Sequence, residues 1–232
     1  MDPGDPSPAP GTAADDSFAA ALRGFGPTGI LASLLVLTTA AVLGPLKSLP
    51  VLAWAALSRT PWSAIGFVRP RSWLVTIATG VVAGAGCKLA LKAVVLPPMG
   101  APPINPTYHF LVGNTAALPA MMFSVLVGAA FGEEVVFRGY LFERLGRWLG
   151  NSATARVAIV TTTAVLFGLA HLHDQGISGA EQATIVGLLF GGVYAATGQL
   201  PLLMIAHAAF DVTAVLIIYF DLELRIAHLF FR

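Results

Sequence analysis

Two adjacent glutamates and one arginine stand in a stretch that is otherwise apolar. Glu133, Glu134 and Arg138 lie within residues 131–140, whose other members are Phe, Gly, Val and Tyr. Ionisable side chains are costly in hydrocarbon, so in a membrane segment they indicate a functional site by default. A carboxylate in such a place suits a general base that activates water. A structural ion-pair knot between helices is the alternative, and the stretch alone leaves both open.

Helical spacing separates the two glutamates. Glu134 and Arg138 are four residues apart and share a helix face, so an ion pair between them is predicted. Glu133 and Arg138 are five residues apart, which is roughly 140° around a helix of 3.6 residues per turn. Glu133 is therefore expected to point elsewhere, and it is the candidate base.

Two later apolar runs add histidines. Phe167 precedes His171 by one helical turn, and His207 precedes Asp211 by one turn. A lone intramembrane histidine more often bonds one helix to another than catalyses a reaction. A glutamate and two histidines on three separate runs supply more: a carboxylate to activate water, imidazoles to bind or polarise, and an aspartate to orient one imidazole.

These three motifs resemble, in order and spacing, those of the CPBP family. That family comprises the type II CAAX prenyl endopeptidases and the bacterial Abi, or bacteriocin-processing, relatives. The resemblance covers roughly residues 120–220, and three motifs in order on three membrane runs are quite specific. The motifs are Glu133-Glu134-x-x-x-Arg138, Phe167-x-x-x-His171 and His207-x-x-x-Asp211.

The resemblance implies an intramembrane endopeptidase and a role for each matching position. Glu133 would be the general base for a water that His171 also holds. Glu134 together with Arg138 would shape the site. Peptides or membrane-protein segments are the implied substrates.

His207 and the residue at position 211 would, by the same resemblance, polarise the scissile carbonyl and stabilise the oxyanion. The sequence departs from the pattern here, because the family frequently has Asn where this chain has Asp211. An ionised aspartate can only accept hydrogen bonds, whereas an asparagine can donate one. Asp211 is therefore expected to orient His207 and to leave His207 as the donor.

Glu133, His171 and His207 could also supply three zinc ligands with one open position. The sequence has no H-E-x-x-H helix, which would set two imidazoles one turn apart beside a base. The same side chains could activate water without metal, as in a glutamate-type peptidase. Zinc and the metal-free form both stay open.

The composition is that of a membrane protein. Of 232 residues, 56% are hydrophobic and only 11% are charged, and the mean hydropathy is +0.78; a soluble domain carries about 25% charged residues. The prediction is an all-α, polytopic transmembrane helical bundle with about six to eight spans, short or kinked ones included. A net charge of +1 offers no basic surface for nucleic acid.

The apolar runs must position the motifs. We expect a disordered tail over residues 1–25 and one transmembrane domain over 26–232, with its motif core at 120–220. The first run is either one span with an interfacial segment or two short spans. Polar loops are expected at 97–119 and 173–181. The runs cover residues 26–58, 73–96, 120–147, 156–172, 184–197 and 202–220.

Lys88 and Lys92 lie four apart on one face of the second run. Snorkelling to the headgroups is the simpler interpretation, and a substrate-facing role is the alternative. Arginines flank the loops at 59–71 and 144–156, which predicts that both are cytoplasmic.

The Ala/Gly-rich composition is typical of bacteria, so the bacterial inner (cell) membrane is the expected location. Two other functions compete with peptidase activity. One is a non-enzymatic membrane protein of the same family that acts by binding, in bacteriocin immunity or in sequestration of a regulator. The other is a small proton-coupled transporter that uses Glu133 and Glu134.

Overall fold

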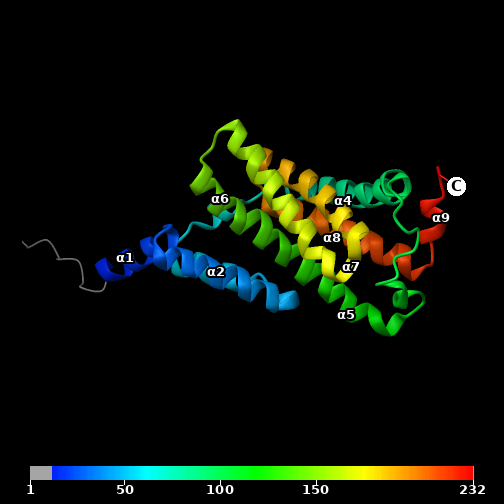
Figure 1. Cartoon of the computed structure of the whole chain (residues 1–232), viewed down its shortest axis with the longest axis horizontal. Helices are drawn as coiled ribbons and strands as arrows, with labels where there is room; N and C mark the ends of the chain where they lie inside the picture. Colours follow the sequence, from blue (N-terminus) through cyan, green and yellow to red (C-terminus); the bar gives the residue numbers. More distant parts are fainter. Residues whose placement is uncertain (1–11, 232) are drawn as a thin grey trace, which may run out of the picture.

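The computed structural model describes residues 12–231, and every regular element in this range is helical (Figure 1). The predicted all-α fold is confirmed. The α-helices are α1 (Thr12–Arg23), α2 (Pro27–Val42), α3 (Leu49–Leu57), α4 (Trp73–Ala90), α5 (Leu118–Phe123), α6 (Leu141–Leu149), α7 (Ala153–Thr197), α8 (Leu200–Tyr219) and α9 (Glu223–Ala227). Two π-helical segments are η3 (Leu91–Val95) and η7 (Ser124–Tyr140), and short 3-10 turns are η1 (Gly44–Leu46), η2 (Trp62–Ile65), η4 (Pro97–Met99), η5 (His109–Leu111) and η6 (Thr115–Ala117).

Four helical stretches of the described chain are long and apolar enough to cross a membrane, or five if the bent pair Asp15–Arg23 and Pro27–Val42 forms one span. The four are Trp73–Val95, Thr115–Leu149, Ala153–Thr197 and Leu200–Tyr219. The predicted number is six to eight spans. The structure reaches six only when the bent pair counts as one span and the two arms of α7 count as two.

Helix α7 consists of two arms joined at Gly176. This residue has φ 67° and ψ −168°, a conformation that favours glycine. The arms lie side by side, because a Cβ atom on Gly187 of the second arm would meet Ala164 of the first. The loop predicted at 173–181 is thus helical apart from this break. Ser152 caps the first arm by accepting from the amide of Ala155 at 3.1 Å.

The N-terminal tail differs from the expectation. Residues 1–11 lie outside the described residues, but Thr12–Arg23 of the predicted disordered segment 1–25 forms α1. Tertiary contacts explain the helix. Trp54 Nε1 donates to the carbonyl of Leu22 at 3.3 Å, and Arg144 donates to the carbonyls of Arg23 and Gly24 at 2.6 and 2.8 Å.

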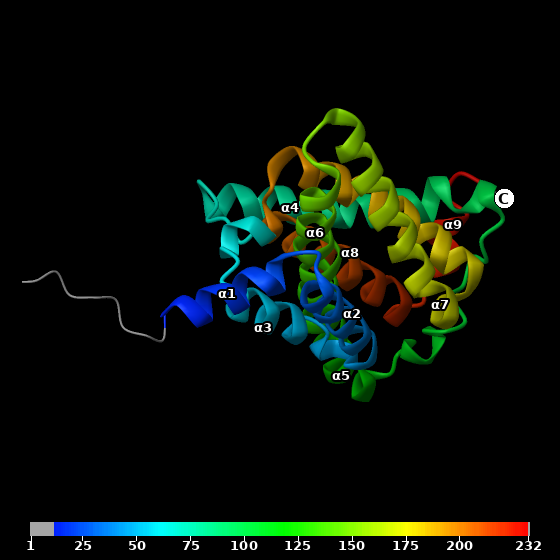
Figure 2. The ribbon, with the colours of Figure 1, turned by 60° about the vertical axis from the view of Figure 1, so that its left-hand side comes forward.

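The continuous helix of residues 115–149 runs through the middle of the molecule (Figure 2). Its π-helical part, η7, packs against α8, α7 and α3. Helix α4 packs in turn on α8, and glycine makes that approach possible. A Cβ atom on Gly84 would lie 1.9 Å from the carbonyl oxygen of Ala206. Small residues let membrane helices come this close, so η7, α8 and α4 pack together as one layer of contacts.

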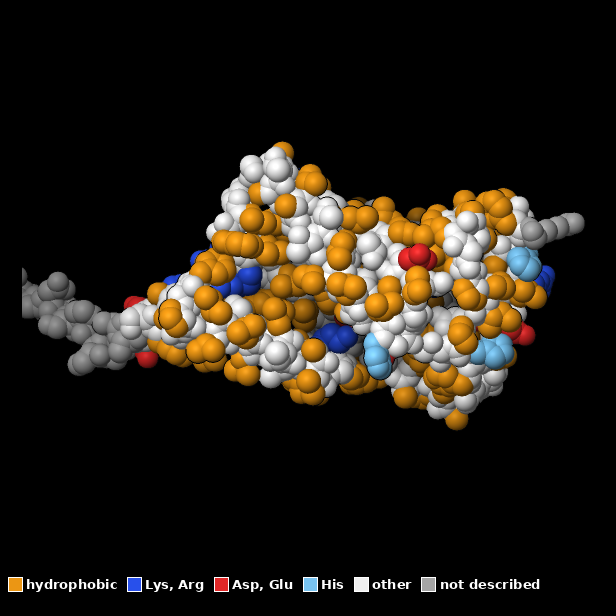
Figure 3. All heavy atoms as spheres, in the orientation of Figure 1, with side chains coloured by type: hydrophobic (Ala, Val, Ile, Leu, Met, Phe, Trp, Pro, Cys, Tyr) orange, Lys and Arg blue, Asp and Glu red, His pale blue; other side chains and the backbone are white. Residues whose placement is uncertain are grey.

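Hydrophobic side chains are spread over the whole face in Figure 3, including the parts over α2 and α7. A hollow opens above α2, and basic side chains lie at its ends. Large apolar side chains point outward on several helices; Leu31, Leu74 and Val157 are 66%, 79% and 66% exposed. An outer surface of this kind fits lipid better than water.

Lys92 does not snorkel to the headgroups. Its ammonium is buried, donates to the carbonyl of Pro103 at 2.6 Å and forms an ion pair with Glu223 of α9 at 2.9 Å. Glu223 also accepts from the backbone amide of Asn105 at 3.1 Å. Helix α9 and the loop after α4 are therefore tied to the end of α4.

Candidate active site

Three helices bring Glu133, His171 and His207 to one point. Oε2 of Glu133, in η7, lies 3.9 Å from Nε2 of His171, in the first arm of α7. The same oxygen lies 3.9 Å from Nε2 of His207, in α8. Straight, parallel spans would separate Glu133 from His171 by roughly 10–15 Å along the membrane normal. The helices do not run straight and parallel, and the predicted convergence of the three residues is present.

The local backbone around Glu133 is unusual. Ser124–Tyr140 is π-helical, and the amide of Leu141 after it donates to the carbonyl of Val136, five residues back. π-Helical turns are rare and occur frequently at functional sites. The expected spacing of 3.6 residues per turn therefore does not hold in η7. The side-chain contacts still separate the two glutamates as predicted.

Glu133 is held by a lysine from a distant part of the chain. Lys47 Nζ donates to Oε1 of Glu133 at 2.8 Å. The other oxygen, Oε2, is buried and has no hydrogen-bond partner among the described residues. Buried polar atoms are nearly always bonded, so an unpaired one calls for a functional explanation. Glu133 thus presents one free carboxylate oxygen to the two histidines.

Glu134 forms the predicted pair with Arg138, with Nη1 of the arginine 2.9 Å from Oε1. Both side chains are completely enclosed, at 0% and 1% exposure. The same Oε1 accepts from Nδ1 of His207 at 2.8 Å. The Arg138 guanidinium lies 4.7 Å from the centre of the Phe167 ring, as in a cation–π contact. This cluster fixes the orientation of His207.

His171 has its tautomer set by the backbone. Its Nδ1–H donates to the carbonyl of Phe167 at 2.8 Å, because a carbonyl oxygen can only accept. Nε2 of the neutral ring is then an acceptor, and it faces Glu133. The Phe167 ring packs edge-on against the imidazole at 4.6 Å, so position 167 both supports and orients the histidine.

Asp211 does not orient His207 in the expected way. Its Oδ2 lies 3.5 Å from Nε2 of His207, on the side of the ring that faces the cavity. The orienting contact at Nδ1 comes from Glu134 instead. Four residues along α8 bring Asp211 beside the histidine, but the ring is turned so that its Nδ1 points to η7. Asp211 is therefore a cavity residue.

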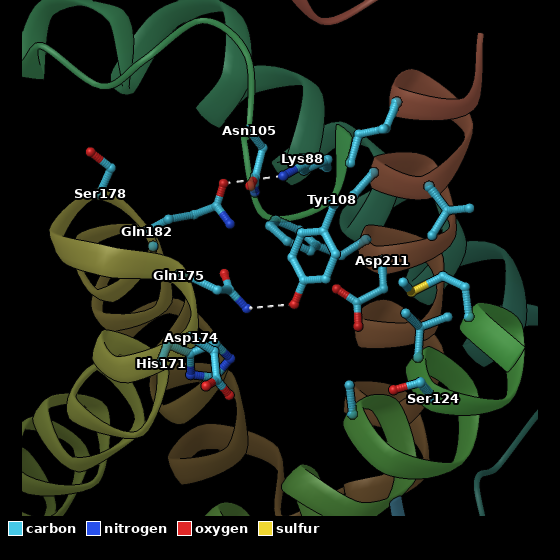
Figure 4. A pocket seen from close by; sticks show the side chains of 18 of the residues that line it. Lys88, Asn105, Tyr108, Ser124, His171, Asp174, Gln175, Ser178, Gln182 and Asp211 are labelled. Carbon is cyan, nitrogen blue, oxygen red and sulfur yellow. Dashed lines mark hydrogen bonds between the residues drawn. The ribbon is translucent and has the colours of Figure 1, made fainter. Parts of the chain in front are cut away.

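The site opens into a cavity of about 630 Å³ between α4, η7, α7, α8 and the loop after α4. Figure 4 shows Tyr108 from that loop between Gln175 and Asp211. Gln175 Nε2 donates to the Tyr108 hydroxyl at 3.2 Å. Burial raises the pKa of the Tyr108 hydroxyl, and the nearby charge of Asp211 raises it further. The phenol is therefore neutral at physiological pH.

Sequence reasoning missed Lys47 and Tyr108 as site residues. Lys47 interrupts the first apolar run, between Pro45 and Pro50. The rule that singled out Glu133, an ionisable group in an apolar setting, applies to Lys47 as well. No local signal distinguishes Tyr108, which lies in a Pro-rich loop and reaches the site only through tertiary packing.

The donors do not fit zinc as placed. Among the described residues, no group of three His, Cys, Asp or Glu side chains is arranged to hold a metal ion. Zinc bonds of about 2.0–2.1 Å put tetrahedral ligands about 3.3 Å apart, whereas Oε2 of Glu133 lies 3.9 Å from each imidazole. Lys47 also occupies the other oxygen of Glu133.

Comparison with known protein families gives a match over part of the chain. Residues 115–213 match the family model described as type II CAAX prenyl endopeptidase Rce1-like. The matched segment begins in η6 and ends in α8, so it contains all seven residues that the three motifs name. No curated protein and no solved structure matches the chain.

Proposed function

We propose that this chain, whose residues 115–213 match the family model described as type II CAAX prenyl endopeptidase Rce1-like, hydrolyses a peptide bond in or near the membrane. Its apolar helices and this family identify it as an integral membrane protein. One observation carries the proposal. The free oxygen of Glu133 lies 3.9 Å from Nε2 of both His171 and His207, at the wall of a cavity between membrane-length helices.

The first step is the activation of water between Glu133 and His171. One water molecule can hydrogen-bond to two groups 3.9 Å apart. It donates one hydrogen to Oε2 of Glu133 and the other to Nε2 of His171, leaving a lone pair for the substrate. As the water oxygen bonds to the scissile carbonyl carbon, its proton passes to Glu133.

His207 stabilises the oxyanion in this mechanism. Its Nδ1–H remains hydrogen-bonded to Glu134. In this mechanism the ring is an imidazolium, so its Nε2–H is available to donate to the carbonyl oxygen. Arg138 holds Glu134 from the other side. When the tetrahedral intermediate collapses, the C–N bond breaks and Glu133 returns its proton to the leaving amine. The glutamate is regenerated, and one water is consumed per bond cleaved.

The proposed substrate is a peptide or a segment of a membrane protein, because the cavity lies between membrane-length helices and a loop at one end of them. The bilayer is the expected surrounding. We place the protein in the bacterial inner membrane on the basis of its Ala/Gly-rich composition.

The direct test is Glu133→Gln, which keeps the shape of the side chain but removes the base. Peptide cleavage by the detergent-solubilised protein should fall by roughly 100- to 10,000-fold. Glu143→Gln, which removes a carboxylate from α6 outside the cavity, is the matched control and should stay active. Undiminished cleavage by Glu133→Gln, with an unchanged melting temperature, would remove Glu133 from the base role.

The non-enzymatic alternative makes a different prediction for cells. A protein that acts by binding alone would keep its biological effect in the double variant Glu133→Gln/His171→Ala. A peptidase would lose it.

A further inference from the structure

Lys88 and Lys92 have different partners, although they lie one turn apart at the end of α4 and in η3. Lys92 forms an ion pair with Glu223 and donates to the carbonyl of Pro103. Lys88 forms no ion pair with any carboxylate in residues 12–231. It extends into the cavity of the candidate active site. A cation in such a place is costly unless it has a counter-charge.

The partners of Lys88 are weak ones for an ammonium group. Nζ donates to Oε1 of Gln182, in the second arm of α7, at 3.1 Å, and it lies 5.0 Å from the centre of the Phe210 ring. An ammonium has three donors, and this hydrogen bond uses one. Two N–H groups remain for a ligand in the cavity. Gln182 also has an amide N–H₂ beside them that can donate.

Lys88 lies close to the catalytic groups along the helix axes. Gly84 of α4 packs on Ala206 of α8, and Lys88, one turn further along, reaches Phe210. Phe210 follows His207 by three residues, which is about 4.5 Å along the axis. Figure 4 shows Lys88 and Gln182 at one end of the cavity and His171 at another, with Tyr108 between them and Asp211 on the far side of Tyr108.

We propose that Lys88 and Gln182 form a binding subsite for a carboxylate of the peptide substrate. The carboxylate, from the C-terminus of the peptide or from an acidic side chain, accepts from the Lys88 ammonium and the Gln182 amide. The subsite rests on the proposed peptidase function. The subsite would orient the peptide in the cavity. A substrate whose carboxylate is bound at Lys88 presents to Glu133 a peptide bond within a few residues of that carboxylate.

Asp211 is the competing explanation for the charge of Lys88. Its carboxylate lines the same cavity, but its resolved contact is with His207 at 3.5 Å. If Lys88 serves only to balance Asp211, removing the ammonium will affect neutral and acidic peptides alike. If Lys88 binds the substrate, only the preference for acidic peptides will disappear.

A binding measurement tests the subsite without requiring turnover. Three dye-labelled hexapeptides of Ala, Val and Leu are titrated into solubilised Glu133→Gln protein: one with a free C-terminus, one amidated, and one amidated with a glutamate as its last residue. A charge-assisted contact should tighten binding about tenfold relative to the neutral amide. Preference for the free C-terminus or for the glutamate supports the subsite and identifies the source of the carboxylate. Equal affinity for all three overturns it.

Variants at the subsite then assign the preference to its residues. Lys88→Met should bring the acidic-to-neutral affinity ratio close to one, and Gln182→Glu, which gives Lys88 a counter-charge, should do the same. Lys88→Glu should reverse the preference towards a peptide that ends in lysine amide. Arg71→Met, which removes an exposed positive charge outside the cavity, should keep the ratio. A ratio that survives Lys88→Met overturns the proposal.

Cleavage separates failure of the subsite from failure of the proposed function. Cleavage of these peptides with a kcat/KM ratio that does not depend on Lys88 means that the subsite is wrong and the peptidase stands. If neither the unmodified protein nor any variant with Glu133 intact cleaves the peptides, but binding still shows a preference that depends on Lys88, the proposed peptidase function is wrong and the subsite stands.

Discussion

Lys47 and Glu133, 86 residues apart in the chain, form an ion pair of 2.8 Å beside the candidate catalytic histidines. The lysine takes only Oε1, so the pair aims Oε2 at the imidazoles rather than blocking both oxygens. The lysine side chain is 26% exposed and the glutamate 10%. Lys47 is therefore a positioning residue for the proposed base.

Replacing Lys47 with Met should release the carboxylate of Glu133 and lower kcat by about 100-fold, because small displacements of a reacting group are costly. KM should change little. Lys47→Arg restores a donor and should recover most of the rate. Steady-state kinetics on a peptide substrate test this. A faster Lys47→Met enzyme would mean that the lysine restrains the base instead.

Glu134→Gln should destabilise the protein, because it leaves the enclosed charge of Arg138 without its partner. Breaking a buried pair costs about 3–5 kcal/mol, which corresponds to a fall in Tm of roughly 6–20 °C in a chain of this size. Thermal unfolding in detergent measures it.

The double variant Glu134→Gln/Arg138→Met removes the unpaired charge and should recover part of that Tm without recovering activity. Glu133→Gln, whose partner Lys47 is partly exposed, should lower Tm less than Glu134→Gln. Equal Tm values for the two single variants would contradict a structural role for the Glu134–Arg138 pair.

Asp211→Asn should raise kcat roughly tenfold, since the removal of one oxyanion donor costs even more than this in other hydrolases. The aspartate lies 3.5 Å from Nε2 of His207 and competes with the oxyanion for that N–H. An asparagine would leave the N–H free and add a donor of its own. Slower cleavage by Asp211→Asn would show that the negative charge of Asp211 is needed.

Chelation should leave peptide cleavage unchanged, because the three possible ligands are spaced for a bridging water rather than for zinc. The test is dialysis against EDTA, followed by assay with and without added Zn²⁺. Loss of activity that zinc restores would require Glu133 and the histidines to move closer together than they stand.

The local sequence was sufficient for the membrane class and for the Glu134–Arg138 pair. Long apolar runs predict helices that cross lipid, because a helix satisfies all of its backbone hydrogen-bonding groups within the segment itself. Residues four apart lie near one another on a helix surface, and Glu134 still meets Arg138 although η7 is π-helical. The order of the three motifs also predicted which helices share a site, because each motif carries an isolated polar group that needs partners.

Tertiary structure decided the rest. Lys88 and Lys92 are the same residue type, one turn apart, yet Lys88 bonds to the neutral Gln182 whereas Lys92 is paired with Glu223, 131 residues further on. Lys47 reaches Glu133, and Glu134 rather than Asp211 takes Nδ1 of His207. These contacts join segments far apart in the chain, so they depend on how the helices pack. Periodicity along a single helix carries no information about that packing.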